Sequence, residues 1–237
     1  MAEMKKKFDG VAFDLDGTLY ANYQFYIRIL PFVLKELPLI MAWGKARNTI
    51  RKSNTASLSA PAFYERQAAL MGEYLKKDPG LVRARHEELV YRGWEEVFRR
   101  VPLFPGVKET LREFRDAGIR LGLLSDLPPE RKLENMGLSG FWDAELCSEL
   151  SGGLKPNKTP FLALAEKMGL PPGRILYVGN SVSYDVLGSK SAGMNAALIA
   201  PSLLRRRRSG GRPGGKRAGY ADFVFSSYRQ LSFYVLS

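Results

Sequence analysis

The chain has 237 residues, of which 45% are apolar and 25% charged, so it can form one large or two modest globular domains. Its formal net charge is +12, but much of this charge is local, because the stretch 205–217 holds seven basic residues and no acid. The single cysteine, Cys147, excludes an internal disulfide and suits a reducing compartment. Any mechanism that needs a catalytic histidine would rest on His86, the only one. The basic start shows no secretory signal, so we expect a cytoplasmic protein.

The first hundred residues predict one strand followed by helices. Residues 8–16 (FDGVAFDLD) read as a buried strand that ends in two acids, whereas residues 21–100 contain long helical patterns and almost no strand signal. The apolar stretch 25–43 is interrupted by charges and prolines, so it predicts a pair of buried or interfacial helices and no transmembrane segment. His86 lies in an acidic helical stretch, where we expect a solvated helix face.

From residue 102 onward the pattern alternates between helices and strands. Helices are expected at 107–118, 128–138 (a helix or loop), 159–169, 182–193 and 228–236, and strands at 119–126, 144–148, 174–180, 195–200 and 221–225. This alternation predicts an α/β fold with a doubly wound, Rossmann-like parallel sheet. The core domain is expected to comprise residues 1–20 and 101–237, with residues 21–100 inserted as an all-helical cap domain.

The string DLDGT at residues 14–18 carries the strongest chemical signal. Asp14 and Asp16 are two apart in an extended chain, so both carboxylates point to one side and repel unless a cation lies between them. Oxygen ligands at this density suit Mg²⁺. Gly17 permits a sharp exit from the strand, and backbone N–H groups of the turn, including that of Thr18, can receive a phosphate. An ordinary Asx turn is the alternative, but burying two carboxylates without purpose is costly.

Four further residues near strand ends are weaker candidates. Ser125 can donate a hydrogen bond to a phosphate oxygen, although serine commonly ends strands. Lys155, in a rigid loop between two glycines and a proline, can neutralise a phosphoryl group, although most lysines are simply solvated. Asn180 and Asp185 flank the start of a helix, where Asp185 is either a metal ligand or a residue favoured by the helix dipole.

The four segments DLDGT, LLSD, LKPNKTPF and YVGNSVSYD, in this order, resemble the four motifs of the haloacid dehalogenase-like hydrolase superfamily. The resemblance covers residues 8–20 and about 102–230. The position of the helical insertion is similar to that in members with a helical cap after the first strand. The resemblance therefore implies a hydrolase with this fold.

The resemblance also implies a role for each matching residue. Asp14 matches the nucleophile that becomes an aspartyl-phosphate and binds Mg²⁺. Asp16 matches the general acid and base, whose backbone carbonyl is a further metal ligand. Ser125 matches the hydroxyl that holds the phosphoryl group, and Lys155 the lysine that steadies Asp14 and the phosphate. Asp185 matches the second acid of the last motif.

One position departs from the family pattern, because Asn180 stands where members usually have an aspartate. An amide oxygen can bind Mg²⁺ directly or through water but brings no charge, so we expect weak metal binding. Asp16 separates this chain from the dehalogenases of the superfamily, which lack the second acid. The predicted function is therefore Mg²⁺-dependent hydrolysis of a small phosphorylated metabolite. The alternatives are a phosphomutase and a non-catalytic member that binds a polyanion or a protein.

Two further regions bear on partners and on substrate choice. The basic segment 205–217 predicts a flexible loop, and a solvated loop is favoured over a weak contact with RNA or acidic lipid. The sequence does not indicate the oligomeric state. The cap is expected to determine which substrate the enzyme accepts. Its aromatic and basic residues are candidates for closing over the substrate: Tyr20, Tyr23, Tyr26, Trp43, Lys45 and Arg47.

Overall fold

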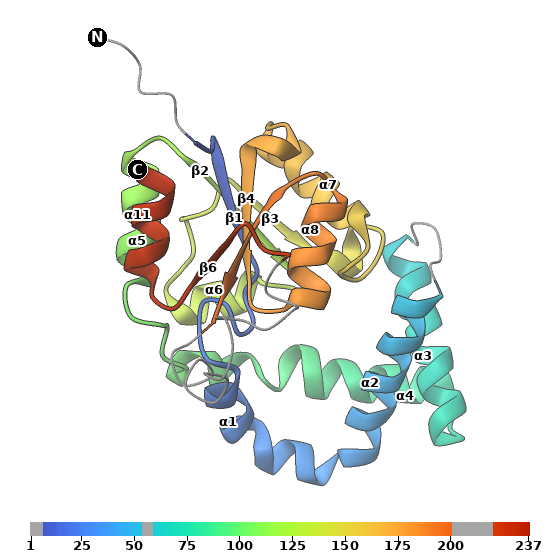
Figure 1. Ribbon diagram of the computed structural model, residues 1–237. Coiled ribbons are helices and arrows are strands. Elements are labelled where there is room, and N and C mark those ends of the chain that lie inside the picture. The colour runs from blue at the N-terminus through green and yellow to red at the C-terminus, as the bar shows by residue number, and fades with distance from the viewer. Residues whose placement is uncertain (1–6, 54–58, 201–219) are drawn as a thin grey trace, which may run out of the picture.

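The computed structural model describes residues 7–53, 59–200 and 220–237, so the basic segment 205–217 lies outside the described residues. Six strands form one parallel sheet in the order β3-β2-β1-β4-β5-β6 (Figure 1). The strands are β1 (Gly10–Phe13), β2 (Arg120–Ser125), β3 (Ala144–Cys147), β4 (Ile175–Gly179), β5 (Asn195–Ile199) and β6 (Phe223–Phe225). The order reverses direction beside β1, as in doubly wound folds that bind ligands at this point.

Helices cover both faces of the sheet (Figure 1). α5 (Val107–Asp116) and α11 (Tyr228–Leu236) pack together on one face, and α7 (Lys158–Met168) and α8 (Leu187–Ser191) cover the other. Successive strand residues divide between the two faces because side chains alternate along a strand. Phe13 joins the cluster that contains Phe114 of α5, whereas Ala12 joins the cluster that contains Phe161 of α7.

The residues between β1 and α5 form the cap. Its α-helices are α1 (Asn22–Lys35), α2 (Leu37–Lys52), α3 (Ala60–Leu75) and α4 (Pro79–His86), followed by a π-helical turn at Glu87–Arg92 and a 3₁₀ segment at Glu95–Arg100. In Figure 1 these helices lie beyond the end of the sheet at which β1 leads into α1. The sheet and the helical insertion confirm the predicted fold class.

The remaining helical segments match the sequence expectations with local differences. α6 (Glu130–Met136) fills the expected helix or loop after β2, and the helix expected at 182–193 begins as a π-helical turn at Val182–Val186 before α8. Among the described residues, no helix is both long enough and apolar enough to cross a membrane.

The expectation that His86 lies on a solvated helix face is wrong. His86 is 2% exposed, and its ring lies 5.3 Å from that of Trp43 and 5.1 Å from that of Tyr91. Trp43 comes from α2, far from His86 in sequence, so the local acidic pattern could not indicate this burial. The histidine is part of the core of the cap.

Candidate active site

Polar residues from neighbouring strands meet at the carboxyl edge of the sheet. β1 pairs with β2 on one side and with β4 on the other, and Phe13 is in register with both Leu123 and Val178. Asp14 directly follows β1 and Asn180 directly follows β4. Parallel strands that end level with one another bring the residues beyond them together, so the sheet itself assembles the site.

Asp14, Lys155 and Asp185 form a buried ion cluster at this edge. The Lys155 Nζ donates to Asp14 Oδ1 at 2.6 Å and to Asp185 Oδ1 at 2.8 Å, and it lies 3.3 Å from the Tyr177 hydroxyl. All three charged side chains are at most 8% exposed. Burial disfavours the ammonium, but Asp14 and Asp185 together raise the pKa of Lys155 well above its ordinary value.

The electrostatic environment of Asp14 is unusual for a carboxylate. Burial raises the pKa of Asp14 to about 7, Lys155 opposes this rise, and the negative charges of Asp185 and Asp16 add to it. Two buried carboxylates thus share one ammonium. The Thr18 hydroxyl donates to Asp14 Oδ2 at 2.7 Å, so each oxygen of Asp14 is held in place.

The turn after β1 packs closely against the end of β4. Gly17 has a φ of +89°, and a Cβ built on it would lie 2.0 Å from the Asn180 side-chain nitrogen and 2.5 Å from that of Asn22. Only glycine fits both the conformation and the space. Asp185 Oδ2 accepts hydrogen bonds from the backbone N–H of Asn180 at 3.1 Å and of Ser181 at 2.9 Å. The first and last motifs are therefore locked together.

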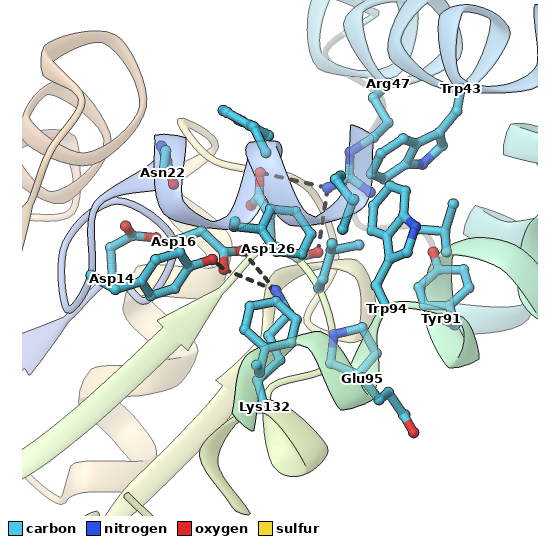
Figure 2. Close-up of a pocket in the computed structure, with 18 of the residues that line it drawn as sticks. Asp14, Asp16, Asn22, Trp43, Arg47, Tyr91, Trp94, Glu95, Asp126 and Lys132 are labelled. Atoms are coloured by element: carbon cyan, nitrogen blue, oxygen red, sulfur yellow. Dashed lines mark hydrogen bonds and ion pairs between the residues drawn. The ribbon is translucent and has the colours of Figure 1, made fainter. Parts of the chain in front are cut away.

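Asp16 is held by two partners that the sequence did not indicate. The Lys132 Nζ, on α6, donates to both Asp16 oxygens at 3.0 and 2.8 Å, and the Tyr20 hydroxyl donates to Oδ1 at 2.5 Å. These contacts fix the carboxylate in one orientation beside Asp14 (Figure 2). Lys132 lies 116 residues from Asp16, and no local pattern marks it.

Arg47 and Arg51 of α2 connect the cap to the core through Asp126. Arg51 pairs with Asp126 Oδ2 at 2.7 Å, and Arg47 lies 3.6 Å from the same oxygen. Ser148 donates to Asp126 Oδ1 at 2.5 Å. Although burial raises the pKa of Asp126, Lys155, Arg47 and Arg51 together hold it well below its ordinary value. Asp126 had no predicted role, because an aspartate after a strand is a common turn residue.

Arg47 also forms a short ion pair with Glu149, a core carboxylate whose side chain is 0% exposed. The Tyr91 and Tyr64 hydroxyls of the cap donate to Glu149 Oε2 at 2.9 and 3.2 Å. Burial raises the pKa of Glu149, and Arg47 opposes this rise. Three side chains of the cap thus bind Glu149, which is, after Asp126, the second core residue that holds the cap to the core domain.

A cavity of about 850 Å³ opens between cap and core. Of the predicted site residues, Asp14, Asp16, Lys155, Asn180 and Asp185 line it. Figure 2 shows Asp14 and Asp16 on one side of it, with Trp43, Trp94 and Tyr91 of the cap on the other.

The other predicted phosphate-binding residues lie behind this lining. Gly17, Thr18 and Ser125 are not among the described residues that line the cavity, and the Ser125 Oγ accepts the N–H of Leu127 at 3.2 Å. Among the predicted closing residues, Tyr20, Tyr26, Trp43 and Arg47 line the cavity, whereas Tyr23 and Lys45 are outside the described lining.

The family model of the haloacid dehalogenase-like hydrolases matches the sequence over residues 8–193, which is most of the chain. The chain belongs to this hydrolase family. The fold of the described residues is similar to that of the haloacid dehalogenase-like (HAD) hydrolase YfnB of Bacillus subtilis, solved bound to magnesium, with a TM-score of 0.66 and 16% identity, and the match covers 98% of this chain and 100% of that one.

Curated HAD relatives of this hydrolase are phosphatases. A glyceraldehyde 3-phosphate phosphatase of Methanocaldococcus jannaschii is 28% identical over 230 residues, 94% of each chain. A phosphoglycolate phosphatase of Shigella boydii is 27% identical over 198 residues, 78% of each chain.

Proposed function

We propose that this chain is a magnesium-dependent phosphate-monoester hydrolase in which Asp14 is the nucleophile. The observation that carries the proposal is the position of Asp14: it ends a buried strand, faces the cavity and lies 2.6 Å from the Lys155 ammonium. A carboxylate next to a buried cation, with Thr18 fixing its second oxygen, can attack a phosphorus atom held at that cation. The phosphatase relatives support the same chemistry.

The proposed reaction consists of two in-line transfers. In the first, a carboxylate oxygen of Asp14 attacks phosphorus, the bond from phosphorus to the ester oxygen breaks, and Asp16 gives a proton to the leaving alcohol. In the second, Asp16 takes a proton from a water molecule that attacks phosphorus, and the bond to Asp14 breaks. Inorganic phosphate leaves, and both aspartates return to their starting forms. Lys155 stabilises the negative charge in both steps.

The residues at the site fit Mg²⁺ as the cofactor. Asp14 and Asp185 are two buried carboxylates that share the Lys155 ammonium, and Asp16 is paired with Lys132, so one negative charge is left for a bound cation to offset. The carboxylates of Asp14 and Asp185, the backbone carbonyl of Asp16 and the amide oxygen of Asn180 would hold it, all of them oxygen ligands. When bound, Mg²⁺ withdraws charge from the phosphoryl oxygens.

This donor set contains an amide and a carbonyl. Within the described ranges no three His, Cys, Asp or Glu side chains are grouped to hold a metal. Two of the four proposed ligands would be neutral, so we expect weak Mg²⁺ binding, because Asn180 stands where the family usually has an aspartate.

The direct test is turnover of p-nitrophenyl phosphate by the purified chain with Mg²⁺ and with a chelator. We expect hydrolysis only with the metal and none in Asp14→Asn, because an amide cannot act as the nucleophile. Asp116→Asn, a change of an exposed aspartate on α5, is the matched control and should behave as wild type. Activity of Asp14→Asn above a few per cent of wild type, with unchanged thermal unfolding, would reject Asp14 as the nucleophile.

A further inference from the structure

The cap contributes a group of apolar side chains to the cavity, beside the charged Arg47, Arg51, Arg92 and Glu95. Phe25 and Ile29 of α1 line it together with Trp43 of α2 and with Trp94 and Phe98, which follow the π-helical turn. The Phe25 ring stacks on Phe98 at 4.9 Å and meets the Trp94 ring edge-on at 5.5 Å. Trp43 and Trp94 also meet edge-on, at 6.0 Å. These contacts make one packed aromatic wall.

This wall faces the proposed phosphate site across the cavity. The charged side chains that line the core side are Asp14, Asp16, Asp126, Glu130, Arg131, Lys132, Lys155 and Asp185. On the cap side Arg47 and Arg51 pair with Asp126 and Arg92 pairs with Glu87, and the aromatic wall itself carries no ionised group. The core thus contributes most of the charge around the cavity and the cap most of its apolar surface; Figure 2 shows Trp43 and Trp94 of the cap, with Arg47 beside them, on the side away from Asp14. A ligand that fills the cavity and packs against the wall would carry its charge at the core end and an apolar body at the other, because polar groups buried against the wall itself would lack partners.

The size of the cavity points in the same direction. A volume of about 850 Å³ is in the upper part of the range of pockets that enclose drug-sized ligands, roughly 300–1,000 Å³. A phosphate ester of two or three carbon atoms, the kind named for the relatives, would leave most of this volume unfilled. Such a substrate would gain little from the wall.

We propose that the preferred substrate is a phosphate monoester whose alcohol part is bulky and largely apolar, with an aromatic ring system or a long alkyl chain. The inference rests on the proposed phosphatase function and adds the substrate class. The phosphate lies at Asp14 and Lys155, and the alcohol part packs against the aromatic wall. Binding energy gained there accelerates hydrolysis when it also holds the phosphorus in line with Asp14.

The experiment compares primary alkyl phosphates, since their leaving alcohols differ little in acidity. Ethyl, hexyl and naphthylethyl phosphate are assayed with the full chain and Mg²⁺, beside p-nitrophenyl phosphate and phosphoglycolate. Each buried methylene is worth about a fourfold gain in affinity, so kcat/KM for naphthylethyl phosphate should exceed that for ethyl phosphate by at least about tenfold. Hexyl phosphate should fall between them.

Two neighbouring residues of α1 provide a matched pair of variants. Val33 lines the cavity, whereas Leu34 is 66% exposed and is not part of the described lining. In Val33→Gln the ratio of kcat/KM for naphthylethyl phosphate to that for ethyl phosphate should fall at least about threefold, because an amide replaces an apolar side chain that lines the cavity. In Leu34→Gln the ratio should stay as in wild type.

The two proposals fail in different ways. If ethyl phosphate or phosphoglycolate is hydrolysed as efficiently as naphthylethyl phosphate, the inference on substrate class is overturned and the phosphatase function stands. An unchanged selectivity ratio in folded Val33→Gln overturns it as well. If none of the esters, p-nitrophenyl phosphate included, is hydrolysed with Mg²⁺ present, the proposed function itself is overturned.

Discussion

Arg47 is the cation on which the buried contact between cap and core depends. Its side chain is 7% exposed, and it faces Glu149, which is 0% exposed, and Asp126. Arg47→Met keeps most of the apolar stem but removes the charge, which leaves the Glu149 carboxylate buried with only the hydroxyls of Tyr91 and Tyr64. Removing one partner of a buried pair costs roughly 3–5 kcal/mol, so we expect a loss of that size in the free energy of unfolding.

The matched control is an arginine whose ion pair lies at the surface. Arg92 pairs with Glu87 at 2.8 Å, and the two side chains are 74% and 48% exposed. Solvent screens this pair, so Arg92→Met should cost at most about 1 kcal/mol. Both variants are compared with wild type by urea denaturation followed by circular dichroism and tryptophan fluorescence.

A second variant tests the cause of the loss. In Arg47→Met combined with Glu149→Gln the uncompensated charge is gone and the tyrosines can donate to the amide oxygen, so part of the lost stability should return. The reasoning would be refuted by an Arg47→Met protein within about 1 kcal/mol of wild type, or by a double variant less stable than the single one.

Three further predictions concern pH, the acid and base, and the metal. Burial, with a smaller contribution from Arg47, lowers the pKa of His86 from 6.5 to about 3, so stability should decline as the pH falls below 6.5. At pH 5 the decline amounts to about 2 kcal/mol, and it should be absent in His86→Phe when denaturation curves at pH 8 and pH 5 are compared; parallel losses in both proteins would contradict this. Asp16→Asn should lower kcat on alkyl phosphates by about 10²- to 10⁴-fold, and Lys132→Met, which frees the Asp16 side chain, should lower it more for alkyl phosphates than for p-nitrophenyl phosphate, whose leaving group needs no acid. Asn180→Asp should lower the Mg²⁺ concentration for half-activation, since it adds a charged ligand, whereas identical titrations would show that Asn180 does not control the metal.

The sequence was sufficient for the features that depend on local pattern. The strands are short apolar runs, and several helices are followed by glycines such as Gly118 and Gly169. The positions of the strands and helices could therefore be predicted from periodicity and turn residues. The positions of Asp14 and Asn180 followed from the strand ends, because parallel strands align their carboxyl ends, and that of Asp185 followed from the helix predicted directly after Asn180. The structure brings these three residues to one edge, as expected.

The features that depend on distant contacts could not be predicted in this way. Asp126 is surrounded by cations only because α2 brings Arg47 and Arg51 to it from 79 and 75 residues away. Lys132 reaches Asp16 only in the folded chain. His86 is buried because α2 covers it with Trp43, although its own segment is rich in charge. In each case the partner that decides the role lies on another element, and no spacing within the segment reports it.

The most direct test of the central claim is to identify the residue that receives the phosphoryl group. In two separate reactions, wild-type protein is mixed with Mg²⁺ and either naphthylethyl phosphate or p-nitrophenyl phosphate. Each reaction is quenched in acid during turnover, and the protein is then digested and examined by mass spectrometry. We predict the added mass of one phosphoryl group on the peptide that contains Asp14, and no such peptide from Asp14→Asn. Turnover with the phosphoryl group on a different residue would contradict the account.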